Sequence, residues 1–113
     1  MEIFKQLKEL GYKHYIDLTI EELDALPIDD IEKRIEYSLV VDWFREEKLI
    51  DILILPQDQS ACDPLPLYFF AIISYKDEIC VELYNSSDKF HYSEFNEARK
   101  QAILKCIELF RKK

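Results

Sequence analysis

The stretch that decides the fold begins at residue 49 and reads Leu49-Ile50-Asp51-Ile52-Leu53-Ile54-Leu55. After a proline-rich loop it continues as Leu67-Tyr68-Phe69-Phe70-Ala71-Ile72-Ile73-Ser74-Tyr75. Both segments are short, rich in β-branched or aromatic residues and bounded by turn residues, which is typical of strands. Residues 78–84 alternate apolar and polar side chains and predict a third strand, with Ile79, Val81 and Leu83 facing inward. Only the short turn Lys76-Asp77 separates the last two segments, so we expect an antiparallel three-stranded sheet.

Helices are predicted on both sides of this sheet in the sequence. Before it, we expect a helix that is capped by Asp29 and ends near Lys48, with an apolar stripe at Ile31, Ile35, Leu39, Val40, Trp43 and Phe44. After it, a helix is expected from a cap at Ser93 to about Arg111, with an apolar stripe at Phe95, Ala98, Ala102, Cys106 and Leu109.

The N-terminal segment carries its own helix signals. A short helix over residues 2–10 should end at Gly11, the only glycine in the chain, in a left-handed cap. Thr19 and Glu22 form a capping box for a second helix that ends before Pro27. We therefore predict one α+β domain over residues 1–113, with a helical hairpin extension (1–28) and a core of order α-β-β-β-α (29–113).

Composition bounds the class of protein. Apolar residues make up 49% of 113 residues, which is enough to form a folded core. The apolar runs are far shorter than the roughly 20 residues of a membrane helix, and no signal peptide is evident, so a cytoplasmic protein without a membrane role is expected. The three cysteines, Cys62, Cys80 and Cys106, form no C-x-x-C pair, which argues against a disulfide framework or a zinc site.

The net charge of −8 is unevenly distributed. Residues 1–66 carry sixteen acids and seven bases, a balance of −9, and residues 67–113 carry seven acids and eight bases. Such a surface repels phosphate backbones, so we expect no direct nucleic-acid binding. Helix capping explains part of the acidity. The remainder forms a candidate surface for a basic protein partner: Asp17, Glu21, Asp24, Asp30 and Glu36.

No catalytic, cofactor-binding or metal-binding residues are predicted, and we expect no enzyme. A single glycine excludes phosphate-binding loops of the G-x-G-x-x-G or Walker A type. His14 and His91 are far apart in sequence, and Cys62 has no neighbouring base that would activate its thiol. The pair Glu46-x-Lys48 falls at a helix end, where the geometry of a metal-dependent nuclease is wrong.

A second candidate surface is apolar. If alternate residues of the 67–75 strand face the helices, then Tyr68, Phe70 and Ile72 face the other way, where Leu53 and Leu55 can join them. A patch of this kind is rarely left in water. Either the N-terminal hairpin covers it or another chain does, including a second copy that pairs through the sheet face or edge.

The order helix–strand–strand–strand–helix is that of double-stranded-RNA-binding domains, and Glu97-Ala98 with Ala102 resembles their last helix. That family binds phosphates with lysines at the start of this helix. Here the stretch is Ser93-Glu94-Phe95-Asn96-Glu97, so the resemblance implies a topology without RNA binding.

Residues 38–113 also resemble a type of small protein from phages and mobile elements. The resemblance rests on Val41-Asp42-Trp43-Phe44-Arg45-Glu46-Glu47, the aromatic strand Tyr68-Phe69-Phe70, and Tyr92-Ser93-Glu94-Phe95-Asn96-Glu97-Ala98. It continues into the helix end Ile103-Leu104-Lys105-Cys106-Ile107-Glu108-Leu109. These motifs cap and pack elements and carry no catalytic residue.

The sequence thus predicts a non-enzymatic, acidic protein-binding module of phage-like origin. One version of this prediction is an inhibitor that docks on a basic, nucleic-acid-handling protein. Two alternatives remain open: a self-associating structural module, and a metal-dependent hydrolase or nuclease that uses scattered carboxylates.

Overall fold

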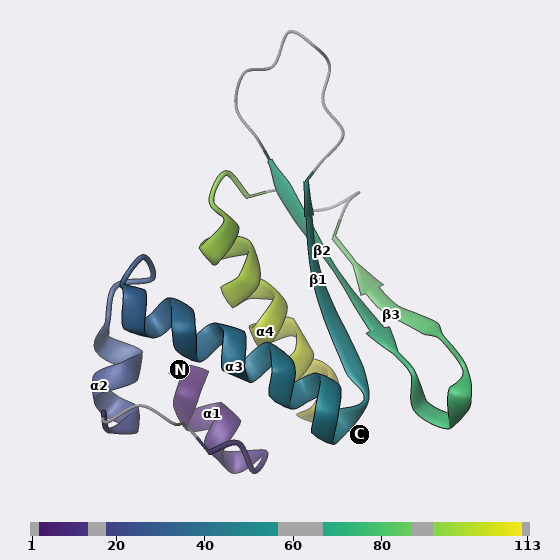
Figure 1. The fold of residues 1–113 in the computed structure, drawn as a ribbon, viewed down its shortest axis with the longest axis horizontal. Coiled ribbons are helices and arrows are strands. Elements are labelled where there is room, and N and C mark those ends of the chain that lie inside the picture. Colours follow the sequence, from purple (N-terminus) through teal and green to yellow (C-terminus); the bar gives the residue numbers. More distant parts are fainter. Residues whose placement is uncertain (1–2, 14–17, 57–66, 87–91, 112–113) are drawn as a thin grey trace, which may run out of the picture.

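The computed structural model describes residues 3–13, 18–56, 67–86 and 92–111. The elements, in order, are α1 (Ile3–Glu9), α2 (Ile20–Ala25), α3 (Ile31–Lys48), β1 (Ile50–Pro56), β2 (Tyr68–Ser74), the 3₁₀ turn η1 (Lys76–Glu78), β3 (Val81–Asn85) and α4 (Phe95–Arg111). Figure 1 shows the sheet beside a layer of helices. The predicted α+β class and the order of its elements are confirmed.

The sheet is antiparallel in the order β1-β2-β3, with β2 in the centre. Ile52 lies opposite Ile72, and Ile54 lies opposite Phe70. Because side chains alternate along a strand, these four residues share one face of the sheet. That face packs on α3 and α4: Ile52, Ile72 and Phe70 are at most 5% exposed and belong to the main core cluster.

The predicted orientation of the central strand is therefore wrong. Phe70 and Ile72 face the helices rather than away from them. Leu53 and Leu55 lie opposite Ala71 and Phe69, which places them on the other face of the sheet, away from Phe70 and Ile72. Both faces of β2 are apolar, so the sequence pattern of this strand did not distinguish them.

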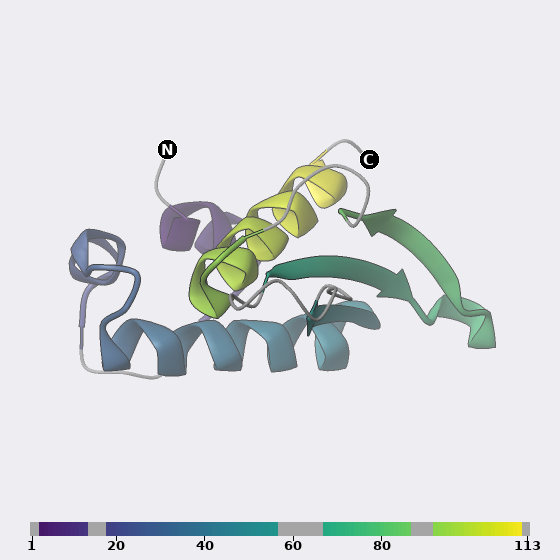
Figure 2. The same ribbon diagram turned by 90° about the horizontal axis from the view of Figure 1, so that it is seen from above.

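The third strand also differs from its prediction. Ile79, Val81 and Leu83 are 60%, 47% and 37% exposed, whereas Tyr84 stacks on Phe70 with ring centres 5.5 Å apart. The pairing of β2 with β3 shifts between Ile72 and Ile73, which leaves one extra residue on β3 and changes the alternation. The β2–β3 turn also extends away from the helices (Figure 2), and the start of β3 is exposed.

The buried face of α3 matches the predicted stripe only in part, at Val40 and Phe44. Ile31 and Ile35 are 68% and 49% exposed, and the buried side chains are Lys33, Glu36, Tyr37, Val40 and Phe44. The cause is the N-terminal hairpin, which packs on this side of α3. Phe4 of α1 stacks on Tyr37 with ring centres 5.7 Å apart. The Lys33 Nζ donates hydrogen bonds to the carbonyls of Asp24 (3.2 Å) and Leu26 (2.8 Å) at the end of α2.

The helix caps predicted at Gly11 and Thr19 are confirmed. Gly11 has φ 104°, and the amides of Gly11 and Tyr12 donate to the carbonyls of Lys8 and Leu7, the Schellman pattern. The predicted capping box is present: the Glu22 amide donates to Thr19 Oγ1 (3.1 Å), and the Thr19 amide to Glu22 Oε1 (3.4 Å). The cap of α3 lies one residue later than predicted, because Asp30 rather than Asp29 accepts from the Glu32 amide.

The N-terminal hairpin packs on helices rather than on the free face of the sheet. α1 contacts α2 and α4, and Tyr12, just after α1, packs edge-on against Trp43 of α3 at 5.5 Å. The core cluster joins α1, α3 and α4 to Ile52, Phe70 and Ile72 on one face of the sheet. Leu55, Phe69 and Ile73 lie on the other face of the sheet and outside this cluster.

Candidate functional site: a groove at the edge of β1

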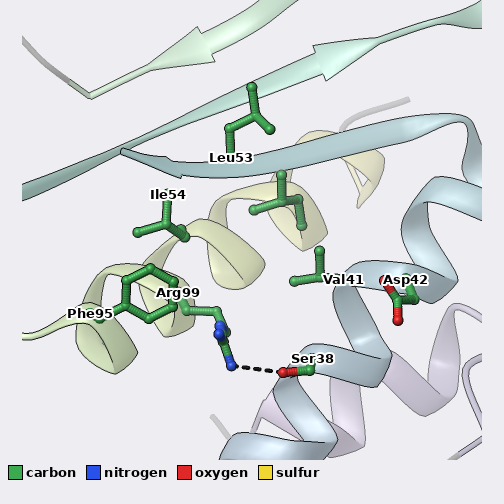
Figure 3. A pocket seen from close by; sticks show the side chains of 8 residues that line it. Ser38, Val41, Asp42, Leu53, Ile54, Phe95 and Arg99 are labelled. Carbon is green, nitrogen blue, oxygen red and sulfur yellow. Dashed lines mark hydrogen bonds between the residues drawn. The ribbon is translucent and has the colours of Figure 1, made fainter. Parts of the chain in front are cut away.

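A hollow of about 280 Å³ opens between α3, α4 and β1. We call it the β1-edge groove, and it is lined by Ser38, Val41, Asp42, Ile52, Leu53, Ile54, Phe95 and Arg99. Figure 3 shows these side chains on the three elements, with Arg99 and Phe95 on the α4 side, Ser38, Val41 and Asp42 on the α3 side, and Leu53 pointing to the other side of β1 from Ile54.

The strand contributes its edge to the groove. Ile52, Leu53 and Ile54 are consecutive residues, and consecutive side chains of a strand point to opposite faces. A hollow that touches all three therefore borders the edge of β1 rather than one of its faces. Within the described part of the chain β1 pairs only with β2, so its other edge keeps backbone N–H and C=O groups outside the sheet ladder.

Arg99 gives the groove its charge. Its Nη1 donates to the Arg34 carbonyl (3.2 Å) and to Ser38 Oγ (3.0 Å), the bond drawn in Figure 3. Its guanidinium carbon lies 4.8 Å from the centre of the Phe95 ring. The side chain is half-buried, and this burial lowers the pKa of Arg99 from its ordinary value. Its ion-pairing capacity is unused, because no described carboxylate lies within salt-bridge distance of it.

Apolar side chains continue the groove along α3. A neighbouring hollow is lined by Ile35 and Asn96 together with Arg34, Ser38, Phe95 and Arg99. Ile35 is 49% exposed and Phe95 is 40% exposed, although both were predicted to lie in buried stripes. The surface therefore combines exposed apolar side chains, a free strand edge and a guanidinium. The sequence did not predict this surface. The only sign of it in the sequence was an arginine, Arg99, that follows the aromatic Phe95 by four residues at the start of the last helix.

The predicted acidic surface separates into different roles. Asp24 accepts hydrogen bonds from the amides of Phe4 (2.8 Å) and Lys5 (3.3 Å) and so caps α1. Asp30 caps α3. Glu36 is fully buried, which corrects its predicted place on the surface. Glu21 is exposed on α2, and Asp17 lies outside the described residues.

The second set of predicted residues has a similar outcome. Phe70 and Ile72 are core residues and present almost no surface. Tyr68 is half-buried, packs edge-on against Phe95 at 5.6 Å, and forms an isolated antiparallel bridge with Tyr92. None of the three lines the β1-edge groove, but Tyr68 supports the Phe95 ring that does.

The part of the chain that the structure describes contains no cluster of three or more His, Cys, Asp and Glu side chains that could hold a metal ion. His14, His91 and Cys62 lie outside the described residues. None of the helices in the described ranges is both long and apolar enough to span a membrane.

We expect the two described cysteines to differ in thiol reactivity. Cys106 is 1% exposed, and burial raises the pKa of its thiol to about 12, whereas Cys80 is exposed. Because the thiolate is the reacting form, a maleimide at neutral pH should modify Cys80 in the folded protein and leave Cys106 intact. Peptide mass spectrometry before and after denaturation measures this. Rapid modification of Cys106 in the native protein would contradict its burial.

Comparison of the chain with protein-family models, curated proteins and solved structures finds no match. The resemblances to phage proteins and to double-stranded-RNA-binding domains therefore stay predictions.

Proposed function

We propose that this chain is a non-enzymatic protein-binding module that docks a segment of a partner protein in the β1-edge groove. The observation that supports it is the combination found there: exposed Ile35 and Phe95, the free edge of β1, and the Arg99 guanidinium without a carboxylate partner in the described part of the chain. Exposed apolar side chains, an unpaired strand edge and a half-buried charge without a counter-ion each cost free energy. A docked polypeptide covers the apolar side chains, pairs with the strand edge and neutralises the charge.

A polypeptide fits this surface better than other ligand classes. An edge strand recognises an extended peptide through backbone hydrogen bonds, and the pockets beside it select side chains. The groove is open and long rather than enclosed, since the hollow near β1 continues into the one beside Ile35. Nucleic acid is disfavoured by the net charge of −8.

This proposal keeps the predicted class of function and changes the surface. Docking on a basic partner was predicted through the acidic residues of the first half. Of these, Asp24 and Asp30 are engaged as caps and Glu36 is buried, so Glu21 is the one described member without such a structural role. The groove is therefore a better candidate than the acidic residues for the surface that binds the partner.

Site-specific photocrosslinking tests the proposal. A photoreactive phenylalanine analogue at Ile35, beside the groove, should crosslink one discrete protein in extract of the source organism. The same analogue at Glu47, exposed near the other end of α3, is the matched control and should not. Excess unlabelled wild-type chain should suppress the crosslink, and excess Ser38→Arg, which fills the groove from an exposed position, should not. Equal crosslinking at both positions would contradict the proposal.

The same experiment addresses self-association, which remains the alternative. Leu55, Phe69 and Ile73 share the sheet face opposite the core residues Phe70 and Ile72, and this apolar face favours a second copy as its cover. A crosslink from Ile35 to the chain itself, with a dimer in light scattering, would support this alternative against a separate partner.

A further inference from the structure

We infer that the segment bound in the β1-edge groove is an extended apolar peptide of another protein that carries a carboxylate, and that this carboxylate pairs with Arg99. The inference rests on the proposed function and names the chemistry of the partner.

Arg99 is held ready for an anion. A half-buried guanidinium loses hydration and is best compensated by a carboxylate. In the structure it has instead two neutral acceptors, the Arg34 carbonyl and Ser38 Oγ, and both engage the same nitrogen, Nη1. Nε and Nη2 therefore keep donors that no described residue accepts. Two donors on one side of a planar guanidinium match the two oxygens of a carboxylate.

The Phe95 ring fixes this geometry. The guanidinium carbon lies 4.8 Å from the ring centre, within the range of a cation–π contact. Tyr68 in turn packs edge-on against Phe95 at 5.6 Å. A side chain that is already held in place loses less conformational entropy on binding, so Arg99 is a pre-organised anchor.

The local charge selects acidic segments although the whole chain is acidic. Arg34 and Arg99 both lie beside the groove, and the Arg34 guanidinium donates to the Asp29 carbonyl rather than to a carboxylate. Asp42, also in the lining, opposes them with one negative charge. Two positive charges against one make this a local attraction on a surface that otherwise repels anions.

The strand edge sets the form of the segment. Ile52, Leu53 and Ile54 present backbone groups along the groove, so an added strand can pair with them. Alternate side chains of that strand then point between β1 and α3, toward Val41. Figure 3 shows Arg99 and Phe95 at the Ile54 end of the groove. The carboxylate is thus expected at that end and apolar side chains along the rest.

Selection of a displayed random-peptide library on the full-length chain tests this inference. Selected peptides should be enriched in Asp or Glu next to β-branched or aromatic residues. Changing the selected acid to its amide should weaken binding about 10- to 100-fold, the typical contribution of a hydrogen bond to a charged group. NMR should map the peptide to the amides of residues 52–54.

Arg99→Gln should weaken the binding of acidic peptides by the same factor. It should also abolish the difference in affinity between the acid and amide forms of the peptide. Lys100→Gln removes one positive charge from the next position of α4 and should leave binding within about twofold. Arg99→Lys keeps the charge without the planar fork and should be intermediate. Equal melting temperatures of the variants show that Arg99→Gln is folded.

Failure of the carboxylate inference is distinguishable from failure of the proposed function. Peptides that bind residues 52–54 without an acid, or that are insensitive to Arg99→Gln, would overturn the carboxylate inference and leave the docking groove intact. Selected peptides that map elsewhere, or a selection that yields none, would count against the proposed function and the inference together.

Discussion

Ile72→Ala is expected to lower the free energy of unfolding by about 2–5 kcal/mol, the usual cost of removing three carbons from a packed core. Ile72 is fully buried at the centre of β2 and belongs to the cluster that joins the sheet to α3, α4 and α1. The cavity that alanine leaves is bordered by two strands and α4, which limits how far the surroundings relax.

Ile73→Ala is the matched control, since it makes the same chemical change one residue away on the opposite face. Ile73 is half-buried and lies opposite Asp51 and Glu82, so the expected cost is about 1 kcal/mol. Urea denaturation followed by circular dichroism measures both variants. A larger loss for Ile73→Ala than for Ile72→Ala would show that the faces of β2 are assigned the wrong way round.

Tyr37→Phe is expected to raise the free energy of unfolding by about 1–3 kcal/mol, the cost of burying an unpaired polar group. Tyr37 is fully buried between α3 and α1, and its hydroxyl has no hydrogen-bond partner among the described residues. Phenylalanine keeps the ring that stacks on Phe4 at 5.7 Å and removes only the hydroxyl.

The same residue makes stability fall at alkaline pH. Burial, reinforced by the negative charges of Asp24 and Glu97, raises the pKa of Tyr37 above its ordinary value of 10.0. Between the unfolded and folded pKa values the folded state retains a proton that the unfolded state has lost. The free energy of unfolding therefore falls as pH rises above about 10, at up to about 1.4 kcal/mol per pH unit for this group.

Denaturation of wild type and Tyr37→Phe from pH 8 to pH 11 measures both effects. The variant should be more stable at pH 8, and its advantage should grow above pH 10. Tyr68→Phe, in a half-buried tyrosine on β2, is the control and should change stability by less than about 0.5 kcal/mol. A loss of stability in Tyr37→Phe would show that the hydroxyl has a partner.

The candidate site was the part least accessible from the sequence. Ile35 and Phe95 have the spacing of core residues, yet both are exposed. Glu36 looks like a surface acid and is buried. Helical periodicity identifies an apolar stripe, but it does not state which side of a helix another element will cover. On α3 the N-terminal hairpin covers the side that carries Lys33 and Glu36, because Lys33 bonds to the end of α2 and Phe4 packs on Tyr37.

Local features were determined by the sequence alone, since their physics is local. Gly11 ends α1 because only a residue without a Cβ adopts φ 104° without strain, and Thr19 with Glu22 bonds the amides within one turn. The order of helices and strands followed from periodicity for the same reason. Contacts between segments distant in the chain decide which face of β2 packs on the helices, which side of α3 is buried and where Arg99 lies. Arg99 bonds to Ser38 across 61 residues, and only the tertiary structure brings them to the edge of β1.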